Sequence, residues 1–130
     1  MDKMKMKGMS FYGYHGVFAE ENRLGQKFIV DLELSLDLDA ASRNDDLEQT
    51  INYAELYAVV KKIVEGPPVK LIEALAGAIA SGVLDAYTMI HELTVGVTKP
   101  NPPFDIHFDG VTVELTRKRG ADGAIMRSES

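Results

Sequence analysis

The sequence predicts an α+β domain with the element order β-β-α-α-β-β, in which four antiparallel strands form a sheet and two helices cover one of its faces. Two observations support this. Segments of alternating polarity occur in two pairs, one in each half of the chain, and both helix-like segments lie between the pairs. A length of 130 residues with 45% hydrophobic residues suits a single domain with a sizeable core.

The first two strands are expected at residues 4–12 and 26–40. In the second segment six apolar residues alternate with polar ones, and only Ile29 interrupts the alternation. A period of two residues buries one face of a strand and exposes the other. The segment 13–25, rich in turn residues, is expected to be a long linker that joins the two strands as an antiparallel pair.

Two helices are expected next. Asn52 is a favourable N-cap, and Glu55 three residues later completes a capping-box pattern. Apolar residues then follow at helical spacing until Gly66 and two prolines end the helix. The second helix is expected over about residues 71–87. Its buried face would consist of Ile72, Leu75, Ala76, Ile79, Ala80, Val83 and Leu84.

Residues 92–99 and 110–117 alternate in polarity and are expected to be the last two strands. The proline-rich segment 100–104 between them cannot form regular structure. The domain is therefore expected to span residues 1–119. Residues 120–130 are mostly small, polar and unpatterned, so a disordered tail is expected there.

Charge and composition exclude several classes of function. Fourteen basic and twenty acidic residues give a net charge of −6, which disfavours nucleic-acid binding. The absence of cysteine excludes disulfides, thiolate nucleophiles and cysteine-ligated metals. No apolar run approaches the roughly 20 residues that span a bilayer. We therefore expect a soluble cytoplasmic protein without membrane or nucleic-acid partners.

An open sheet of four long strands has two unpaired edges, which promote association. Pairing with other copies of the chain into a larger closed sheet is the simplest remedy, so the sequence predicts a homo-oligomer.

Single residues do not identify the chemistry. Lys99 could be a solvated lysine at a strand end, and Glu73 could be a carboxylate favoured by a helix N-terminus. The three histidines, His15, His91 and His107, are too far apart in sequence for a local metal motif, and no metal is expected.

A series of short motifs is more informative than any single residue. The motifs are Phe11-Tyr12-Gly13-Tyr14-His15-Gly16, Glu21-Asn22, Gly25-Gln26, Asn52-Tyr53, Leu71-Ile72-Glu73, Thr98-Lys99-Pro100-Asn101-Pro102-Pro103 and Phe108-Asp109-Gly110-Val111. In this order and spacing they resemble the dihydroneopterin aldolase family over roughly residues 4–119.

The resemblance implies a tunnelling fold, in which subunits join their sheets into a barrel, two tetrameric rings stack into an octamer, and active sites lie between neighbouring subunits. It also implies a reaction of folate biosynthesis, in which 7,8-dihydroneopterin is split into 6-hydroxymethyl-7,8-dihydropterin and glycolaldehyde. The imine of the dihydropterin can itself accept electrons, so the implied chemistry needs no metal, no cofactor and no lysine Schiff base.

The same resemblance implies the site residues. Lys99 would be the general acid and base, acting through a water, and Tyr53 would contact the pterin and assist proton transfer. Glu73 would accept hydrogen bonds from the pterin 2-amino group and N3–H, and the backbone of Ile72 would face the pterin carbonyl. Glu21 would contact the hydroxylated side chain of the substrate or the catalytic water.

Three alternatives remain open. A related pterin enzyme could epimerise dihydroneopterin or its triphosphate at C2′, but Arg23 is the only basic residue evident near Glu21, which favours an unphosphorylated substrate. A zinc-dependent pterin synthase would need clustered histidines. A non-catalytic binding protein would not need Lys99 and Tyr53 together. Asn52, where some family members have histidine, and the loop 102–107 leave the ratio of aldolase to epimerase activity open.

Overall fold

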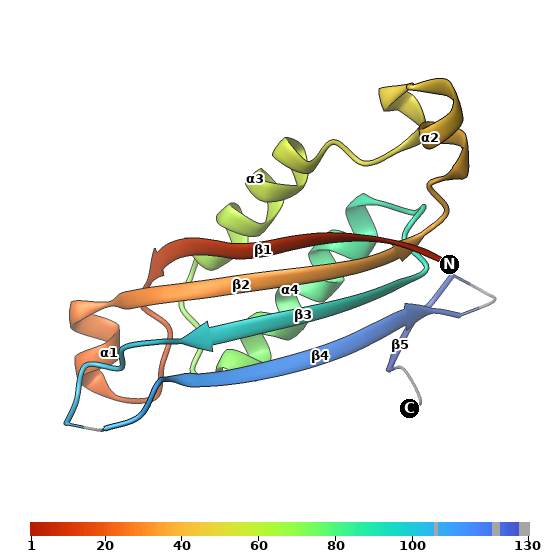
Figure 1. Cartoon of the computed structure of the whole chain (residues 1–130). Coiled ribbons are helices and arrows are strands. Elements are labelled where there is room, and N and C mark those ends of the chain that lie inside the picture. The colour runs from red at the N-terminus through yellow and green to blue at the C-terminus, as the bar shows by residue number, and fades with distance from the viewer. Residues whose placement is uncertain (106, 121–122, 128–130) are drawn as a thin grey trace.

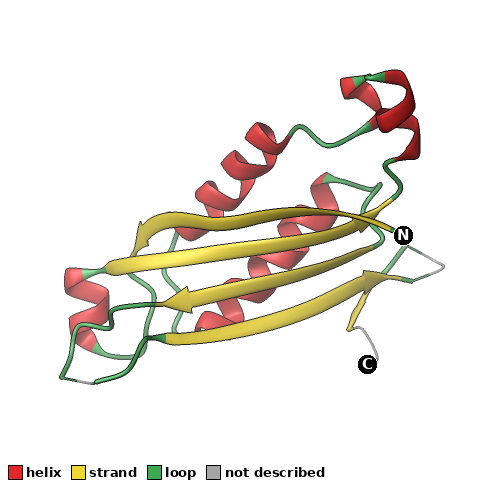
Figure 2. Ribbon diagram, viewed as in Figure 1, coloured by secondary structure: helices red, strands yellow, loops and turns green. Residues whose placement is uncertain are grey.

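The structure is a computed structural model that describes residues 1–105, 107–120 and 123–127. In this part of the chain, five strands form one antiparallel sheet in the order β1-β2-β3-β4-β5. They are β1 (Asp2–Gly13), β2 (Gln26–Leu36), β3 (Glu92–Lys99), β4 (Val111–Arg119) and β5 (Ile125–Arg127). Two long helices, α3 (Tyr53–Val64) and α4 (Ile72–Ala86), cover one face of the sheet (Figure 1, Figure 2). The predicted α+β architecture is confirmed.

The core lies between the sheet and these two helices. Along β2 every second side chain is buried, as the alternation of polarity predicts. α4 packs on β3 and β4, and α3 packs on α4 and β1. The apolar side chains predicted for α4 are all buried in this layer. The best-buried core residues of the strands are Phe28, Val30, Leu32, Leu34, Leu36, Leu93, Val95 and Val97.

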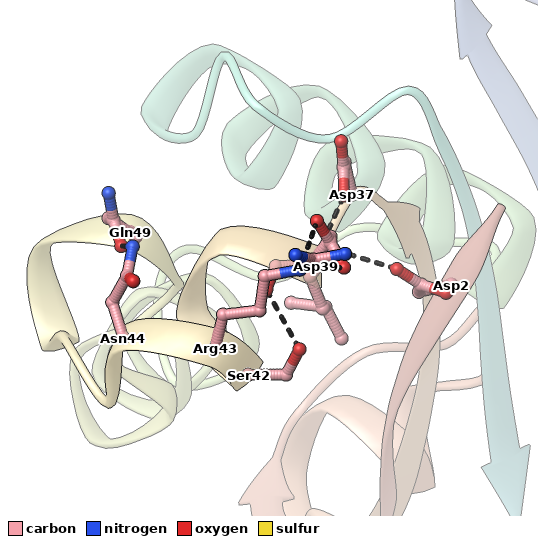
Figure 3. A network of polar contacts seen from close by, with 8 residues as sticks. Asp2, Asp37, Asp39, Ser42, Arg43, Asn44 and Gln49 are labelled. Atoms are coloured by element: carbon pink, nitrogen blue, oxygen red, sulfur yellow. Dashed lines mark hydrogen bonds and ion pairs between the residues drawn. The ribbon is translucent and has the colours of Figure 1, made fainter.

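The second strand is shorter than the alternation predicts: it ends at Leu36 and does not continue to residue 40. Aspartate side chains capture the next backbone amides: Asp2 Oδ2 accepts from Leu38 N at 2.9 Å, and Asp37 Oδ1 accepts from Asp39 N at 2.9 Å. The bond between Asp37 and Asp39 is local, and such bonds favour a turn over a strand. Helix α2 (Asp39–Asn44) begins there, held by the polar contacts in Figure 3.

Two more segments differ from the prediction. The linker between the first two strands contains a helix, α1 (Ala19–Leu24), and a single 3-10 turn, η1 (Leu47–Gln49), follows α2. Both helices α1 and α2 are only 6 residues long, too short for an apolar stripe to become visible in the sequence. Asn52 is confirmed as the N-cap of α3, since its Oδ1 accepts from Ala54 N at 3.0 Å.

The C-terminal segment is more ordered than expected. Ile125–Arg127 forms β5, which pairs with Arg117–Arg119 of β4, so a fifth strand extends the sheet. Residues 121–122 and 128–130 of the expected tail lie outside the described residues. Among the described helices, none combines the length and apolarity needed to cross a bilayer.

Helix direction determines which residues can meet. α3 begins on the α2 side of the molecule and runs toward the end where α1 lies, and α4 runs back in the opposite direction (Figure 1). The N-terminus of α4, helix α1 and the C-terminal end of β3 therefore gather at one end of the sheet.

Candidate active site

A pocket of about 370 Å³ opens at the end of the sheet where β3 ends and α4 begins. Its walls come from six parts of the chain: the α1 segment, the α3–α4 loop, the first turn of α4, the end of β3, the loop after β3, and β4. The lining residues that matter for chemistry are Glu21, Ile72, Glu73 and Lys99. The fold thus brings together four of the five site residues that the resemblance implied.

A buried ion pair lies at this site. The Nζ of Lys99, the last residue of β3, donates to Glu21 Oε2 at 2.6 Å. The side chain of Glu21 is 2% exposed and that of Lys99 13% exposed. Because water is largely excluded, the attraction between the two charges is stronger than in a surface pair. The pair places a proton donor and a proton acceptor side by side at the pocket.

Three hydrogen bonds hold the Glu21 carboxylate. Besides Lys99, the Nε2 of Gln26 donates to Oε2 at 2.9 Å, and the backbone N–H of Phe18 donates to Oε1 at 3.3 Å. Burial alone raises the pKa of Glu21, but the hydrogen bonds from Lys99, Gln26 and Phe18 and the charge of Lys99 outweigh it and hold this pKa below its usual 4.5. Glu21 is therefore ionised at neutral pH.

His15 connects the two loops that form one side of the site. Its Nδ1 accepts from Val69 N at 3.0 Å, so its Nε2 carries the proton and donates to Val64 O at 2.7 Å. The neighbouring Gly16 N donates to Val69 O at 2.9 Å. This buried imidazole therefore joins the segment before α1 to the α3–α4 loop, and we assign it a structural role.

Gly16 leaves the space that Glu21 occupies. Its φ of +151° lies in a region that side chains disfavour, and a Cβ at this position would lie 2.4 Å from the Glu21 carboxylate. Only glycine therefore allows Glu21 to lie this close to the backbone of the loop.

Ile72 and Glu73 are the first two residues of α4. Ile72 is buried, and the Glu73 side chain is exposed at the pocket. The free backbone N–H groups of this first turn favour a carboxylate nearby. Glu73 is consequently an acceptor at the pocket that a ligand with adjacent N–H groups can reach.

Tyr53 lies far from this pocket. It is the first residue of α3 and is 68% exposed. Its neighbours Asn52 and Glu55 border Tyr87, which follows the C-terminus of α4. α4 has 15 residues, and at about 1.5 Å per residue it separates the two ends by about 22 Å. Within one chain, Tyr53 therefore cannot join Lys99 and Glu73.

Sequence reasoning missed several pocket residues. The rings of Phe18 and Phe104 meet edge to face, with their centroids 5.3 Å apart, and both line the pocket. Lys70 lines it as well, so Arg23 is not the only basic residue near Glu21. No motif marks these residues, because Phe104 and Lys70 reach Phe18 only through the tertiary fold.

Potential metal ligands do not cluster in the described ranges, which contain no group of three or more histidine, aspartate or glutamate side chains that could hold an ion.

Two solved structures have the same fold. One is a dihydroneopterin aldolase from Vibrio cholerae, described as putative, with a TM-score of 0.84 and 28% identity; the match covers 92% of this chain and 98% of that one. The other is the Escherichia coli dihydroneopterin aldolase in complex with neopterin, with a TM-score of 0.82 and 26% identity over 90% and 99% of the two chains. The fold and the pocket together define a tunnelling-fold protein whose pocket contains the Lys99–Glu21 ion pair.

A family model described as dihydroneopterin aldolase matches residues 4–116. The dihydroneopterin aldolase of Bacillus subtilis is 59% identical over 119 residues, which cover 92% of this chain and 99% of the relative. The chain belongs to the dihydroneopterin aldolase family.

Proposed function

We propose that this chain cleaves 7,8-dihydroneopterin into 6-hydroxymethyl-7,8-dihydropterin and glycolaldehyde, as a step of folate biosynthesis. The observation that carries the proposal is the Lys99–Glu21 pair, 2.6 Å apart, in a pocket that also contains the Glu73 carboxylate. The Lys99–Glu21 pair can move protons, while the Glu73 carboxylate anchors a heterocycle. Binding of neopterin by the related Escherichia coli enzyme supports a pterin as the occupant.

The pterin ring is expected to bind at the first turn of α4. A carboxylate accepts two parallel hydrogen bonds well, and the pterin 2-amino group and N3–H present two adjacent donors. Glu73 would accept these bonds, and the backbone at Ile72 would face the pterin carbonyl. The apolar rings of Phe18 and Phe104 add contact area on the pocket wall.

Proton transfer is assigned to Lys99, acting through a water. Removal of the proton from the 2′-hydroxyl lets the C1′–C2′ bond break, and glycolaldehyde leaves with the new carbonyl group. The bonding electrons move into the C6=N5 imine of the dihydropterin, and C1′ then receives a proton to give the hydroxymethyl group. The neutral amine of Lys99 takes up the hydroxyl proton through the water and, as the ammonium, gives a proton back to C1′, while Glu21 stays ionised and holds Lys99 in place.

We further propose that the enzyme is an oligomer, most simply an octamer of two tetrameric rings, in which Tyr53 reaches the pocket of a neighbouring subunit. β1 is one edge of the sheet, and β5 covers only residues 117–119 of the β4 edge, so both edges can pair with other copies. Tyr53 is exposed at the end of the molecule opposite its own pocket, where a neighbour could use it. A cytoplasmic location remains a prediction.

The test is incubation with 7,8-dihydroneopterin, with and without a chelator, and chromatography of the products. Lys99→Ala should lower kcat by roughly 10²–10⁴, the usual contribution of one acid–base group, and should change affinity for the pterin product much less. Lys61→Ala, at an exposed position of α3, is the matched control and should retain wild-type kcat.

Borohydride distinguishes this mechanism from covalent catalysis. Treatment in the presence of substrate should leave the enzyme active and unlabelled, because no lysine Schiff base forms. Labelling of Lys99, or full activity of the alanine variant, would contradict the assignment. The same chromatogram would reveal a 2′-epimer and so measure the predicted epimerase side activity.

A further inference from the structure

Gln26 is the first residue of β2 and is 4% exposed. Its side chain points to the core face of the strand, where the next residues on that face, Phe28 and Val30, are apolar. Its Nε2 donates to Glu21 Oε2 at 2.9 Å, and the same oxygen accepts from Lys99 Nζ at 2.6 Å. Gln26 and Lys99 therefore hold one carboxylate oxygen between them.

The oxygen of the Gln26 side-chain amide has no hydrogen-bond partner among the described residues. In the described part of the chain, Gln26 Oε1 is the single buried side-chain oxygen or nitrogen without a hydrogen bond. A buried acceptor that loses its bonds to water destabilises the folded state. An apolar side chain of similar length would fill the same space without this penalty. Filling space in the core therefore does not explain glutamine at this position.

Gln26 is buried and does not line the pocket, so we expect no direct contact between it and a substrate. Its influence has to pass through Glu21. Without the bond from Gln26, the Oε2 atom keeps only its contact with Lys99, and the carboxylate and the ammonium can shift together. A misplacement of about 1 Å can cost a large factor in rate.

We propose that Gln26 is a positioning residue that fixes Glu21 Oε2 against Lys99 Nζ, and that its unpaired buried oxygen is tolerated for this purpose. The proposal rests on the acid–base role proposed for Lys99. It assigns the buried glutamine a function in the rate of the reaction and none in the binding of the pterin.

The charged and polar groups around Glu21 set the expected pH behaviour. Lys99 faces the carboxylate from β3, and the Phe18 N–H faces it from the loop before α1. Lys70 and Glu73 line the same pocket from the α3–α4 loop and from α4. Burial raises the pKa of Glu21 and the hydrogen bonds lower it. Without the donor from Gln26, fewer hydrogen bonds counteract burial, so the pKa of Glu21 should rise.

Gln26→Met is the decisive variant, because it keeps the length of the side chain and removes the amide. We expect a kcat lower by about 10-fold and a KM within about 2-fold of wild type, with little change in melting temperature, because the lost hydrogen bond to Glu21 and the removal of the unpaired Oε1 oppose each other. The acid limb of the pH–kcat profile should move to higher pH. Carboxyl-carbon NMR of Glu21 should show the same upward shift of its titration, independently of turnover.

Val30→Ala is the matched control, since it lies on the same face of β2 and is fully buried. It should lower the melting temperature and leave both the acid limb and the Glu21 titration unchanged. Gln26→Asn, whose amide is too short to reach Glu21, should repeat the effect of Gln26→Met on kcat.

Wild-type kcat and an unchanged Glu21 titration in Gln26→Met would overturn the proposal, as would failure of both Gln26 variants to fold. Inactivity of the wild-type enzyme with 7,8-dihydroneopterin would instead contradict the proposed function. The NMR titration separates these two outcomes, because it reports on the Gln26–Glu21 bond without substrate.

Discussion

At the scale of single residues, the position of Glu21 depends on the absence of a side chain at Gly16. Gly16→Ala would place a Cβ 2.4 Å from the carboxylate and would strain a backbone with φ of +151°. We expect a loss of about 1–3 kcal/mol in the free energy of unfolding and a kcat at least 10-fold lower. Thermal denaturation and steady-state kinetics measure the two effects.

Gly8→Ala separates backbone strain from the clash. Gly8 also has a positive φ, +68°, but a Cβ there would meet nothing within 4 Å. This control should lose stability and keep its kcat. Equal kcat losses in both variants would show that Gly16 does not act through Glu21.

Glu73 is predicted to anchor the pterin. Glu73→Gln replaces one acceptor oxygen by a donor, which would face a donor on the ligand, and removes the charge that strengthens the pair. We expect pterin binding to weaken by about 2–4 kcal/mol, measured by titration of the 6-hydroxymethyl product or an analogue. Glu55→Gln, the first-turn glutamate of α3, is the control and should bind like wild type. Unchanged pterin affinity in Glu73→Gln would show that Glu73 does not bind the pterin and only places a charge at the helix terminus.

At the scale of elements, Arg119 at the end of β4 holds the C-terminal end of α4. Its Nη2 donates to Leu84 O at 2.8 Å and to Tyr87 O at 3.3 Å, and its Nε donates to Ile90 O at 3.3 Å. The carbonyls at a helix C-terminus have no partners within the helix, and a cation there also interacts favourably with the helix dipole.

Arg119→Ala should therefore lower the free energy of unfolding by about 1.5–3 kcal/mol, as seen for hydrogen bonds to charged groups. Its KM should stay near wild type, because this end of α4 is remote from the pocket. Arg43→Ala provides the comparison: its ion pair with Asp39 is largely exposed and should contribute less than about 1 kcal/mol. Chemical denaturation of both variants measures the difference, and equal losses would contradict the capping role of Arg119.

At the scale of the whole molecule, the distance between Tyr53 and the pocket has a direct consequence. If sites form between subunits, Tyr53→Phe and Lys99→Ala remove different parts of the same site from different chains. Each variant alone should be nearly inactive. Mixed and reassembled in equal amounts, they should recover about one quarter of wild-type activity, since in one site of four an intact Lys99 meets a neighbour's intact Tyr53.

Sedimentation should accompany the mixing experiment. We expect one large species at micromolar concentration for each variant and for the mixture. A stable wild-type monomer with full activity, or a mixture that recovers nothing, would contradict a site shared between subunits.

Sequence patterns predicted much of the fold, because the main elements satisfy local rules. The alternation in β2 and the apolar stripe of α4 each require one buried face, and Asn52 caps α3 through bonds within its own turn. The same rules failed at Asp37, whose side chain accepts from the Asp39 amide where the strand ends early, and at α1, which is too short to show a period. The first failure comes from competition by a side-chain hydrogen bond, and the second from the short length of the helix; alternation alone reveals neither.

For the candidate site, the sequence by itself determined which residue types are present and, through motif resemblance, predicted that Glu21, Tyr53, Ile72, Glu73 and Lys99 form one site. Only the tertiary structure decided that Lys99 bonds to Glu21, that Gln26 is buried with one unpaired oxygen, and that Tyr53 lies at the end of α3 remote from the pocket. The physical reason is the sequence distance over which each kind of interaction acts. Periodicity and capping act within a few residues, whereas Lys99 follows Glu21 by 78 positions and meets it only because β3 pairs with β2 beside α1.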